Sequence, residues 1–182
     1  MELLSSIQRI RDALRTIPDF PKPGIQFIDI TPVLQDGQLF RLSINLLIER
    51  FHKKRLDAIV GVDARGFILG GAVACQLGIG FVPMRKKGKL PYKTKSLSYD
   101  LEYGSATLEV HEDAIKPGQR IALVDDLLAT GGTSAAAAAL IEQLGGEIIE
   151  MSFLVELAEL GGAEKIKKYP VYSIVTIGER PA

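Results

Sequence analysis

Apolar residues along this chain form two kinds of pattern that alternate with each other. Short apolar runs, typical of buried strands, recur between segments whose apolar residues return every three or four positions. The spacing predicts helices over 2–16, 38–52, 67–77 and 135–144, and strands at 58–62, 80–84, 121–124, 147–155 and 171–177. Strands separated by helices form parallel crossovers, so the pattern predicts an α/β fold with a mostly parallel twisted sheet and helices on both faces.

The segment at about 18–36 interrupts this alternation. Its prolines keep the chain irregular until a stretch at 25–30, where alternating apolar and polar residues predict one short exposed strand. Phe27 lies in this stretch, and two interpretations of it stay open. Either the ring is tucked into the core beneath a covering loop, or the segment forms a hood whose aromatic ring lies over a flat ligand.

A second interruption covers about 91–117. This segment is polar and contains two alternating stretches, 96–101 and 106–111, which predict a hairpin that turns near Tyr103. It is long for a simple connection, so we expect a mobile lid. Neither interruption has the composition of an interdomain linker, and residues 1–182 are expected to form a single domain.

Polar chemistry is concentrated where the strand at 121–124 gives way to a helix. The apolar residues end at Asp125 and Asp126, and a loop of small and hydroxylic residues follows: Ala129, Thr130, Gly131, Gly132 and Thr133. Backbone amides at a helix start, beside threonine hydroxyls, can bind a phosphate monoester, and two carboxylates can accept hydrogen bonds from a vicinal diol. The combination predicts a ribose 5-phosphate site, and the competing interpretation is an ordinary turn with solvated acids.

Two other predicted strands also end in charged residues. Asp63 and Arg65 follow one of them, and the basic run that contains Lys86 and Lys89 follows the next. Because open parallel sheets bind ligands at the carboxyl ends of their strands, we expect these groups near the acid pair. The alternatives are a local ion pair between Asp63 and Arg65, which caps a turn, and a solvated basic loop.

Composition narrows the choice of protein class. The 182 residues include 22 basic and 22 acidic side chains, and this zero formal charge argues against a protein built mainly around nucleic acid. No stretch is long enough to span a bilayer and residues 1–21 lack a signal-peptide apolar core, so we expect a cytoplasmic protein with no membrane partner. Cys75 is the only cysteine, and its apolar neighbours predict a buried, inert thiol.

The motifs together resemble the type I phosphoribosyltransferases, which bind 5-phospho-α-D-ribose 1-diphosphate (PRPP). The sequence of residues 124–133 resembles that of the adenine phosphoribosyltransferase branch of the family, and residues 61–67 are similar to its diphosphate loop. Residues 20–27 resemble its purine-binding hood, and 98–104 resemble its catalytic flexible loop. The chain departs from the family at Ile28, where Arg or Lys is common, so only backbone contacts to a ligand are expected from that position.

The resemblance implies a role for each candidate residue. Glu102 acts as the acid–base group on the purine, and Asp125 and Asp126 hold the ribose hydroxyls. The other roles are phosphate binding by Ala129, Thr130, Gly131, Gly132 and Thr133, diphosphate binding by Arg65, Lys86, Lys89 and Tyr103, and adenine binding by Gln26, Phe27 and Leu127. The resemblance further implies Mg²⁺ carried by PRPP, with no dedicated protein cage, and a homodimer.

The activity implied by the resemblance is transfer of the phosphoribosyl group from PRPP to adenine, giving AMP and diphosphate in purine salvage. Two alternatives stay open: a transferase for another purine base, and a regulator of the same fold that senses PRPP or a purine without turning it over. A regulator would usually need a nucleic-acid or partner domain. The zero net charge, the length of one domain and the Leu-Glu-Tyr-Gly motif at 101–104 favour the enzyme.

Overall fold

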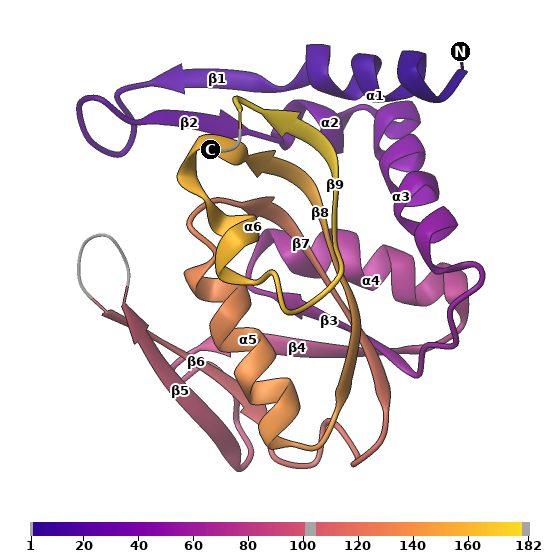
Figure 1. Ribbon diagram of the computed structural model, residues 1–182, viewed down its shortest axis with the longest axis vertical. Helices are drawn as coiled ribbons and strands as arrows, with labels where there is room; N and C mark the ends of the chain where they lie inside the picture. The colour runs from indigo at the N-terminus through magenta and orange to yellow at the C-terminus, as the bar shows by residue number, and fades with distance from the viewer. Residues whose placement is uncertain (1, 101–104, 180–182) are drawn as a thin grey trace. The chain divides into compact units, whose positions relative to one another are not determined.

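The computed structural model describes residues 2–100 and 105–179, which divide into two compact units. The N-terminal unit ends at Leu46 and the C-terminal unit begins at Leu47. The N-terminal unit contains α1 (Glu2–Ala13), β1 (Arg15–Pro18), β2 (Gln26–Asp29), α2 (Thr31–Gln35) and the start of α3 (Gly37–Phe51) (Figure 1).

The N-terminal unit differs from the sequence-based prediction at the end of its first helix. The predicted helix over 2–16 ends at Ala13, because the chain from Arg15 pairs as an antiparallel strand with β2. Thr16 and Ile17 are β-branched, and such side chains favour a strand over the last turn of a helix. The short strand predicted at 25–30 is confirmed as β2.

The C-terminal unit is built on a seven-stranded sheet with the order β5-β6-β4-β3-β7-β8-β9. Its strands are β3 (Ala58–Val62), β4 (Gly80–Lys86), β5 (Thr94–Asp100), β6 (Ser105–His111), β7 (Arg120–Leu128), β8 (Glu147–Leu157) and β9 (Val171–Ile177). The five strands from β4 to β9 in this order are parallel, and the β5–β6 hairpin adds antiparallel pairs at one edge. The mostly parallel sheet is therefore confirmed.

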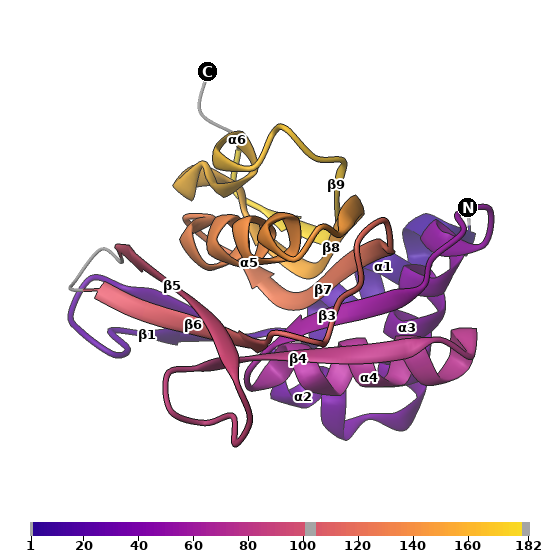
Figure 2. The same cartoon turned by 90° about the horizontal axis from the view of Figure 1, so that it is seen from below.

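Helices cover both faces of this sheet, as predicted. Figure 2 shows α4 (Arg65–Leu77) on one face, and α5 (Gly132–Gln143) with α6 (Gly162–Lys165) on the other. A short 3₁₀ turn, η1 (Ala158–Leu160), precedes α6. The central strands are apolar on both sides because both faces are covered, and every residue of β3 is buried. None of the helices described has the length and apolar character that crossing a membrane needs.

Two local predictions were wrong. The strand at 121–124 does not end at the acid pair, because β7 stays paired with β8 through Asp125 and on to Leu128. Cys75 is exposed rather than buried. Its neighbours Val73 and Ala74 occupy the inner face of α4, and one further step along a helix turns the side chain away from that face.

Candidate active site

The loops that follow β3, β4 and β7 open at one edge of the C-terminal sheet. β3 pairs in parallel with both β4 and β7, so the carboxyl ends of the three strands face the same direction. Asp63 lies in the first loop and Arg65 begins the helix that follows it, whereas the basic run starts in the last residues of β4. The acid pair lies near the end of β7, just before the small-residue loop. The structure thus brings together three stretches that are far apart in the sequence.

The two carboxylates at the end of β7 are buried. Asp125 is 9% exposed and Asp126 is 7% exposed. Oδ1 of Asp125 accepts a hydrogen bond of 2.9 Å from the backbone N–H of Asp126. The same oxygen lies against Gly66, where a Cβ would approach it to 2.5 Å, so the start of α4 leaves room for the carboxylate only because residue 66 is glycine.

Burial sets the ionisation of Asp125. Loss of hydration raises the pKa of this carboxyl well above its ordinary value, and the adjacent charge of Asp126 raises it further. The hydrogen bond from the Asp126 amide and the positive charge of Arg65 act in the opposite direction. Asp125 is therefore a carboxylate whose negative charge is costly in the folded protein and is stabilised by any positive charge that comes near it.

Arg65 joins the first loop to the acid pair. Its Nε donates to Oδ2 of Asp126 in an ion pair, and its side chain remains 42% exposed. The guanidinium therefore spans from a buried carboxylate to the open edge of the sheet. This placement fits the predicted contact with a diphosphate, because an arginine can hold a carboxylate with one side of its fork and present other N–H groups to a ligand.

The small-residue loop after β7 leads to a helix start that is open to a ligand. Gly131 has φ of +75°, which only glycine adopts without strain, and it is the N-cap residue of α5. Within the described part of the chain the N-cap position supplies no side-chain cap, because Gly131 has no side chain, so it does not occupy the backbone amides of the first turn. Leu127 and residues 129–134 line a pocket at this point. Uncapped amides and the positive end of the helix dipole in one pocket suit a phosphate group.

Gly162 at the start of α6 fixes the shape of this loop, a role that the sequence analysis missed. A Cβ at Gly162 would overlap the carbonyl oxygen of Ala129, and a Cβ at Gly131 would come to 2.6 Å from the carbonyl oxygen of Gly162. The two backbones can approach this closely only because both residues lack side chains. The sequence signal was the Gly161-Gly162 pair, which marks a turn but does not show which backbone lies opposite it.

Two carboxylates accept hydrogen bonds from the basic run, which begins in the last residues of β4. Oδ2 of Asp63 accepts from Nε of Arg85 and from the backbone N–H of Lys86, both at 3.4 Å. Glu109 Oε2 accepts from the backbone N–H of Gly88 at 2.9 Å. Asp63, predicted as the partner of Arg65 under one alternative, thus contacts the next strand.

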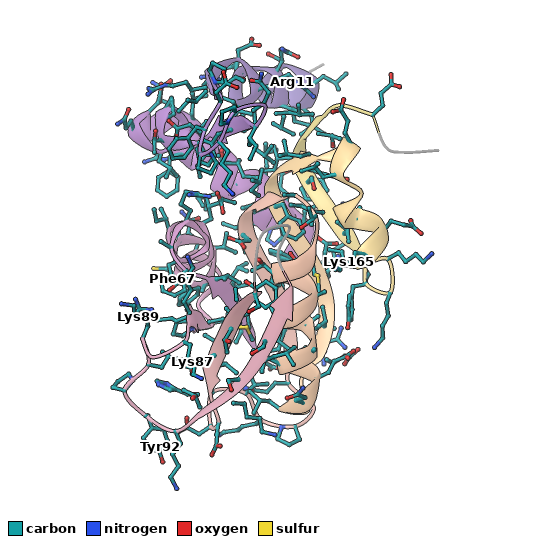
Figure 3. All side chains as sticks on the ribbon, turned by 90° about the vertical axis from the view of Figure 1, so that its left-hand side faces the viewer. Arg11, Phe67, Lys87, Lys89, Tyr92 and Lys165 are labelled. Carbon is teal, nitrogen blue, oxygen red and sulfur yellow. The ribbon has the colours of Figure 1, made fainter. Side chains whose placement is uncertain are left out.

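The lysines of this run are left at the surface. Lys86, Lys87 and Lys89 are exposed, and Figure 3 shows Lys87 and Lys89 on the connection between β4 and β5 with Lys89 pointing away from the ribbon. Lys86 is the last residue of β4, and its own backbone N–H is the group that Asp63 accepts. The predicted diphosphate lysines therefore project from the end of a strand and from the turn after it, which is consistent with either a phosphate contact or the solvated basic loop.

Four further candidate residues are not among the described residues of the C-terminal unit. Glu102 and Tyr103 lie outside the described residues. Gln26 and Phe27 belong to the N-terminal unit, where the Phe27 ring meets Phe20 edge-on at a centroid distance of 5.1 Å. Contacts of the base with Phe27 and with Leu127 of the C-terminal unit stay predictions.

Comparison with known proteins identifies the family. A family model described as the phosphoribosyl transferase domain matches residues 33–179. An adenine phosphoribosyltransferase of Methylacidiphilum infernorum is 53% identical over 173 residues, which are 95% of this chain and 97% of the relative. One of Desulfitobacterium hafniense is 58% identical over 162 residues, 89% of this chain and 94% of the relative. The chain belongs to the adenine phosphoribosyltransferase family.

Solved structures of the family share the fold. The adenine phosphoribosyltransferase of Rhodothermus marinus superposes with a TM-score of 0.91 at 48% identity, covering 96% of this chain and 99% of that one. The enzyme of Saccharomyces cerevisiae, solved with adenine and an imino-altritol bisphosphate, gives a TM-score of 0.89 at 40% identity and covers 94% and 99%. The predicted fold class and the family resemblance are thereby confirmed.

The contact between Gly162 and the small-residue loop predicts that Gly162→Ala weakens PRPP binding. The new methyl group must push Ala129 and the loop aside, which typically costs about 1–3 kcal/mol of stability. Because the loop is predicted to bind the 5′-phosphate, losing one hydrogen bond to that charged group should weaken PRPP binding by about one to two orders of magnitude. Calorimetric titration with PRPP and thermal unfolding measure the two effects.

Gly161→Ala is the matched control. Gly161 has φ of +66° but no atom near the position of a Cβ, so alanine there strains the backbone without pushing on the loop. We expect a loss of stability of about 1 kcal/mol with PRPP affinity close to wild type. Equal loss of PRPP affinity in both variants would contradict a specific role for Gly162.

The raised pKa of Asp125 predicts a pH-dependent effect of Asp125→Asn on stability. Both the folded and the unfolded chain carry the protonated acid well below the ordinary pKa of about 3.9, so the carboxyl costs little there. As pH rises above that value the unfolded chain releases the proton more readily than the folded protein, and stability falls. Asn removes the ionisation, so the variant should be about 1–2 kcal/mol more stable than wild type at neutral pH, with a smaller difference near pH 4.

Thermal unfolding across pH 4–8 measures this difference, with Asp113→Asn as the control. Asp113 is exposed, and its replacement should change the free energy of unfolding by less than about 0.5 kcal/mol at every pH. A destabilised Asp125→Asn variant at neutral pH would show that the charged carboxylate is needed to hold the fold together.

Proposed function

We propose that the protein transfers the 5-phosphoribosyl group of PRPP to adenine, giving AMP and diphosphate. The observation that supports this best is the uncapped start of α5 directly after the buried pair Asp125 and Asp126. A phosphate-binding loop and a diol-binding acid pair, separated only by Leu127 and Leu128, suit a ribose 5-phosphate. Relatives that are more than half identical over nearly the whole chain are adenine phosphoribosyltransferases.

The reaction requires charge of both signs to be stabilised at one edge of the sheet. As the bond from the anomeric carbon to diphosphate breaks, positive charge grows on the ribose ring and negative charge on the departing diphosphate. Asp125 and Asp126, proposed to hold the ribose hydroxyls, place buried negative charge beside the ring. Burial alone disfavours the ionised form of Asp125. A positive charge that develops on the ribose ring favours that ionised form, and the carboxylate stabilises the ring in return.

The diphosphate leaving group is proposed to bind to the basic residues at the same edge of the sheet. Arg65, Lys86 and Lys89 are proposed to face the diphosphate, together with Tyr103. Arg65 is fixed by its ion pair to Asp126, so one residue links the charge at the ribose to the charge at the leaving group. Such fixed charges need no rearrangement as the bond breaks, which is the condition for effective electrostatic stabilisation.

The 5′-phosphate is proposed to lie on Ala129, Thr130, Gly131, Gly132 and Thr133. Its contacts are remote from the bond that breaks, so they serve to position the ribose against the acid pair. Mg²⁺ is proposed to arrive with PRPP. The adjacent carboxylates Asp125 and Asp126 lie at this edge, which fits an ion that binds through one or two carboxylates and otherwise through substrate and water. The chemistry it would supply there is charge neutralisation at the diphosphate.

Adenine is proposed to bind through Gln26, Phe27 and Leu127, with Glu102 acting on its proton. Attack by N9 of adenine requires net loss of one proton, and a carboxylate near N7 can manage that loss. The Saccharomyces cerevisiae enzyme was solved with adenine, and the Giardia lamblia enzyme, 35% identical, was solved with 9-deazaadenine. A role in purine salvage follows from this activity. The cytoplasmic location stays a prediction from the pattern of apolar residues, and the homodimer stays a prediction from the family resemblance.

Competition between bases tests the proposed activity. We expect AMP formation from adenine and PRPP in the presence of Mg²⁺, with a kcat/KM well above those for guanine, hypoxanthine and orotate. A larger kcat/KM for guanine or hypoxanthine would support the alternative of another purine base. Binding of PRPP without product from any base would support the regulator.

Glu102→Gln tests the acid–base role. Gln keeps the size of the side chain and a hydrogen-bonding carbonyl but cannot exchange a proton, and general acid–base groups typically contribute about 10²–10⁴-fold to rate. We therefore expect kcat to fall by that factor while the Kd of PRPP for the free enzyme stays near wild type. Steady-state kinetics and PRPP titration separate the two, and full turnover by the variant would remove Glu102 from the mechanism.

A further inference from the structure

Tyr99, a residue of β5, contacts Thr133 at the end of the small-residue loop, which is proposed to bind the 5′-phosphate. Its hydroxyl lies 3.1 Å from Oγ1 of Thr133, so β5 of the hairpin is joined to the first turn of α5 by a hydrogen bond between two side chains. The ring packs against the hydrophobic core of the C-terminal unit, which holds the hydroxyl in place. The bond connects elements that are 34 residues apart in the sequence.

The chemistry of the two hydroxyls limits how they can act together on a phosphate. Each hydroxyl donates one proton and accepts up to two. Either atom can be the donor when no phosphate is present. A phosphate dianion only accepts, so Thr133 must direct its proton to the phosphate in order to bind it. The bond to Tyr99 then survives only if Tyr99 donates and Thr133 accepts.

We propose that Tyr99 is a positioning residue for the 5′-phosphate: it donates to Thr133 and thereby directs the Thr133 proton to the phosphate. This rests on the proposed function, in which Thr133 binds that phosphate. A hydroxyl that receives a hydrogen bond becomes a better donor, since neighbouring bonds in a chain polarise one another. A threonine hydroxyl without a partner can point its proton in several directions, and it loses this freedom when it binds a phosphate. While Tyr99 donates to Thr133, the Thr133 proton cannot point toward Tyr99, so less freedom is lost on binding.

A second consequence concerns the hairpin. Glu102 follows Tyr99 by three residues in the sequence. A Thr133 hydroxyl that donates to the phosphate is a better acceptor for the Tyr99 proton, so the phosphate strengthens this bond and with it the attachment of β5 to α5. Coupling between two sites is reciprocal, so an attached hairpin strengthens phosphate binding by the same factor. The 5′-phosphate thus favours the arrangement that anchors the strand leading to the proposed acid–base residue.

Tyr99→Phe tests the proposal because it keeps the ring and removes only the hydroxyl. A typical net hydrogen bond corresponds to about a two- to twelve-fold change in an equilibrium constant, and we expect the Kd of AMP and of PRPP with Mg²⁺ to rise by that factor. The Kd of adenosine, which lacks the phosphate, should not change. Weaker binding of adenosine and AMP alike would overturn the proposal, because it would indicate a general disturbance of the site.

Ser98→Ala is the matched control. Ser98 Oγ and Thr107 Oγ1 form another hydroxyl–hydroxyl bond of 2.9 Å in the same hairpin, and successive side chains of a strand point to opposite faces. Its loss should disturb the hairpin to a similar extent without touching Thr133. We expect AMP and PRPP affinities close to wild type, and an equal weakening in both variants would overturn the proposal.

Thr133→Val completes a double-mutant cycle. Valine keeps the shape of threonine and removes the hydroxyl through which Tyr99 is proposed to act, so Tyr99→Phe should change AMP affinity in the wild-type background and have almost no further effect in Thr133→Val. An equal effect in both backgrounds would mean that Tyr99 acts through packing. Wild-type protein that binds PRPP but forms no AMP would overturn the proposed function, whereas unchanged AMP affinity in Tyr99→Phe would overturn only the role of Tyr99.

Discussion

Two adjacent carboxylates buried at the end of β7 are the constraint around which the site is arranged. Asp125 and Asp126 are each less than a tenth exposed, and the adjacent charge of Asp126 adds to the burial that raises the pKa of Asp125. Three features around them reduce this cost: the Arg65 guanidinium on Asp126, the backbone N–H donated to Asp125, and the space left by Gly66. A fold selected for stability alone would replace such a pair with apolar side chains, so its presence points to the chemistry it performs.

Around the acid pair, the parallel sheet sets the edge at which the loops emerge, and glycines allow neighbouring segments to approach closely. Parallel pairing of β3 with its two neighbours turns three loops to one edge, but it does not bring their backbones into contact. The close approaches occur where no side chain intervenes, at Gly66 under Asp125 and at Gly131 against Gly162. The phosphate loop is therefore shaped by α6, an element that carries none of the proposed ligand contacts.

The sequence revealed the parts of this arrangement that depend on local pattern. β3 and β9 have the predicted bounds, and the acid pair and small-residue loop lie at the predicted edge. The sequence failed where tertiary pairing decides the outcome. β7 continues through its acids because β8 remains hydrogen-bonded to it, and residues 15–18 leave the first helix because β2 offers a partner strand. Gly162 was missed because the importance of a glycine depends on which backbone lies opposite, and spacing along one chain does not contain that information.

The proposed contacts to the 5′-phosphate and to adenine place different demands on the protein. The 5′-phosphate is the portion of PRPP that does not react, so its binding free energy can be used to hold the ribose against the acid pair. That use requires a loop already in its final shape, because any rearrangement on binding would consume part of the same free energy. The contact between Gly131 and Gly162 and the uncapped start of α5 provide such a loop before ligand arrives. Adenine must enter before the proposed acid–base residue Glu102 can act on it, and AMP must leave afterwards. In the sequence Glu102 falls between β5 and β6, which form the edge of the sheet, and not next to one of its central strands.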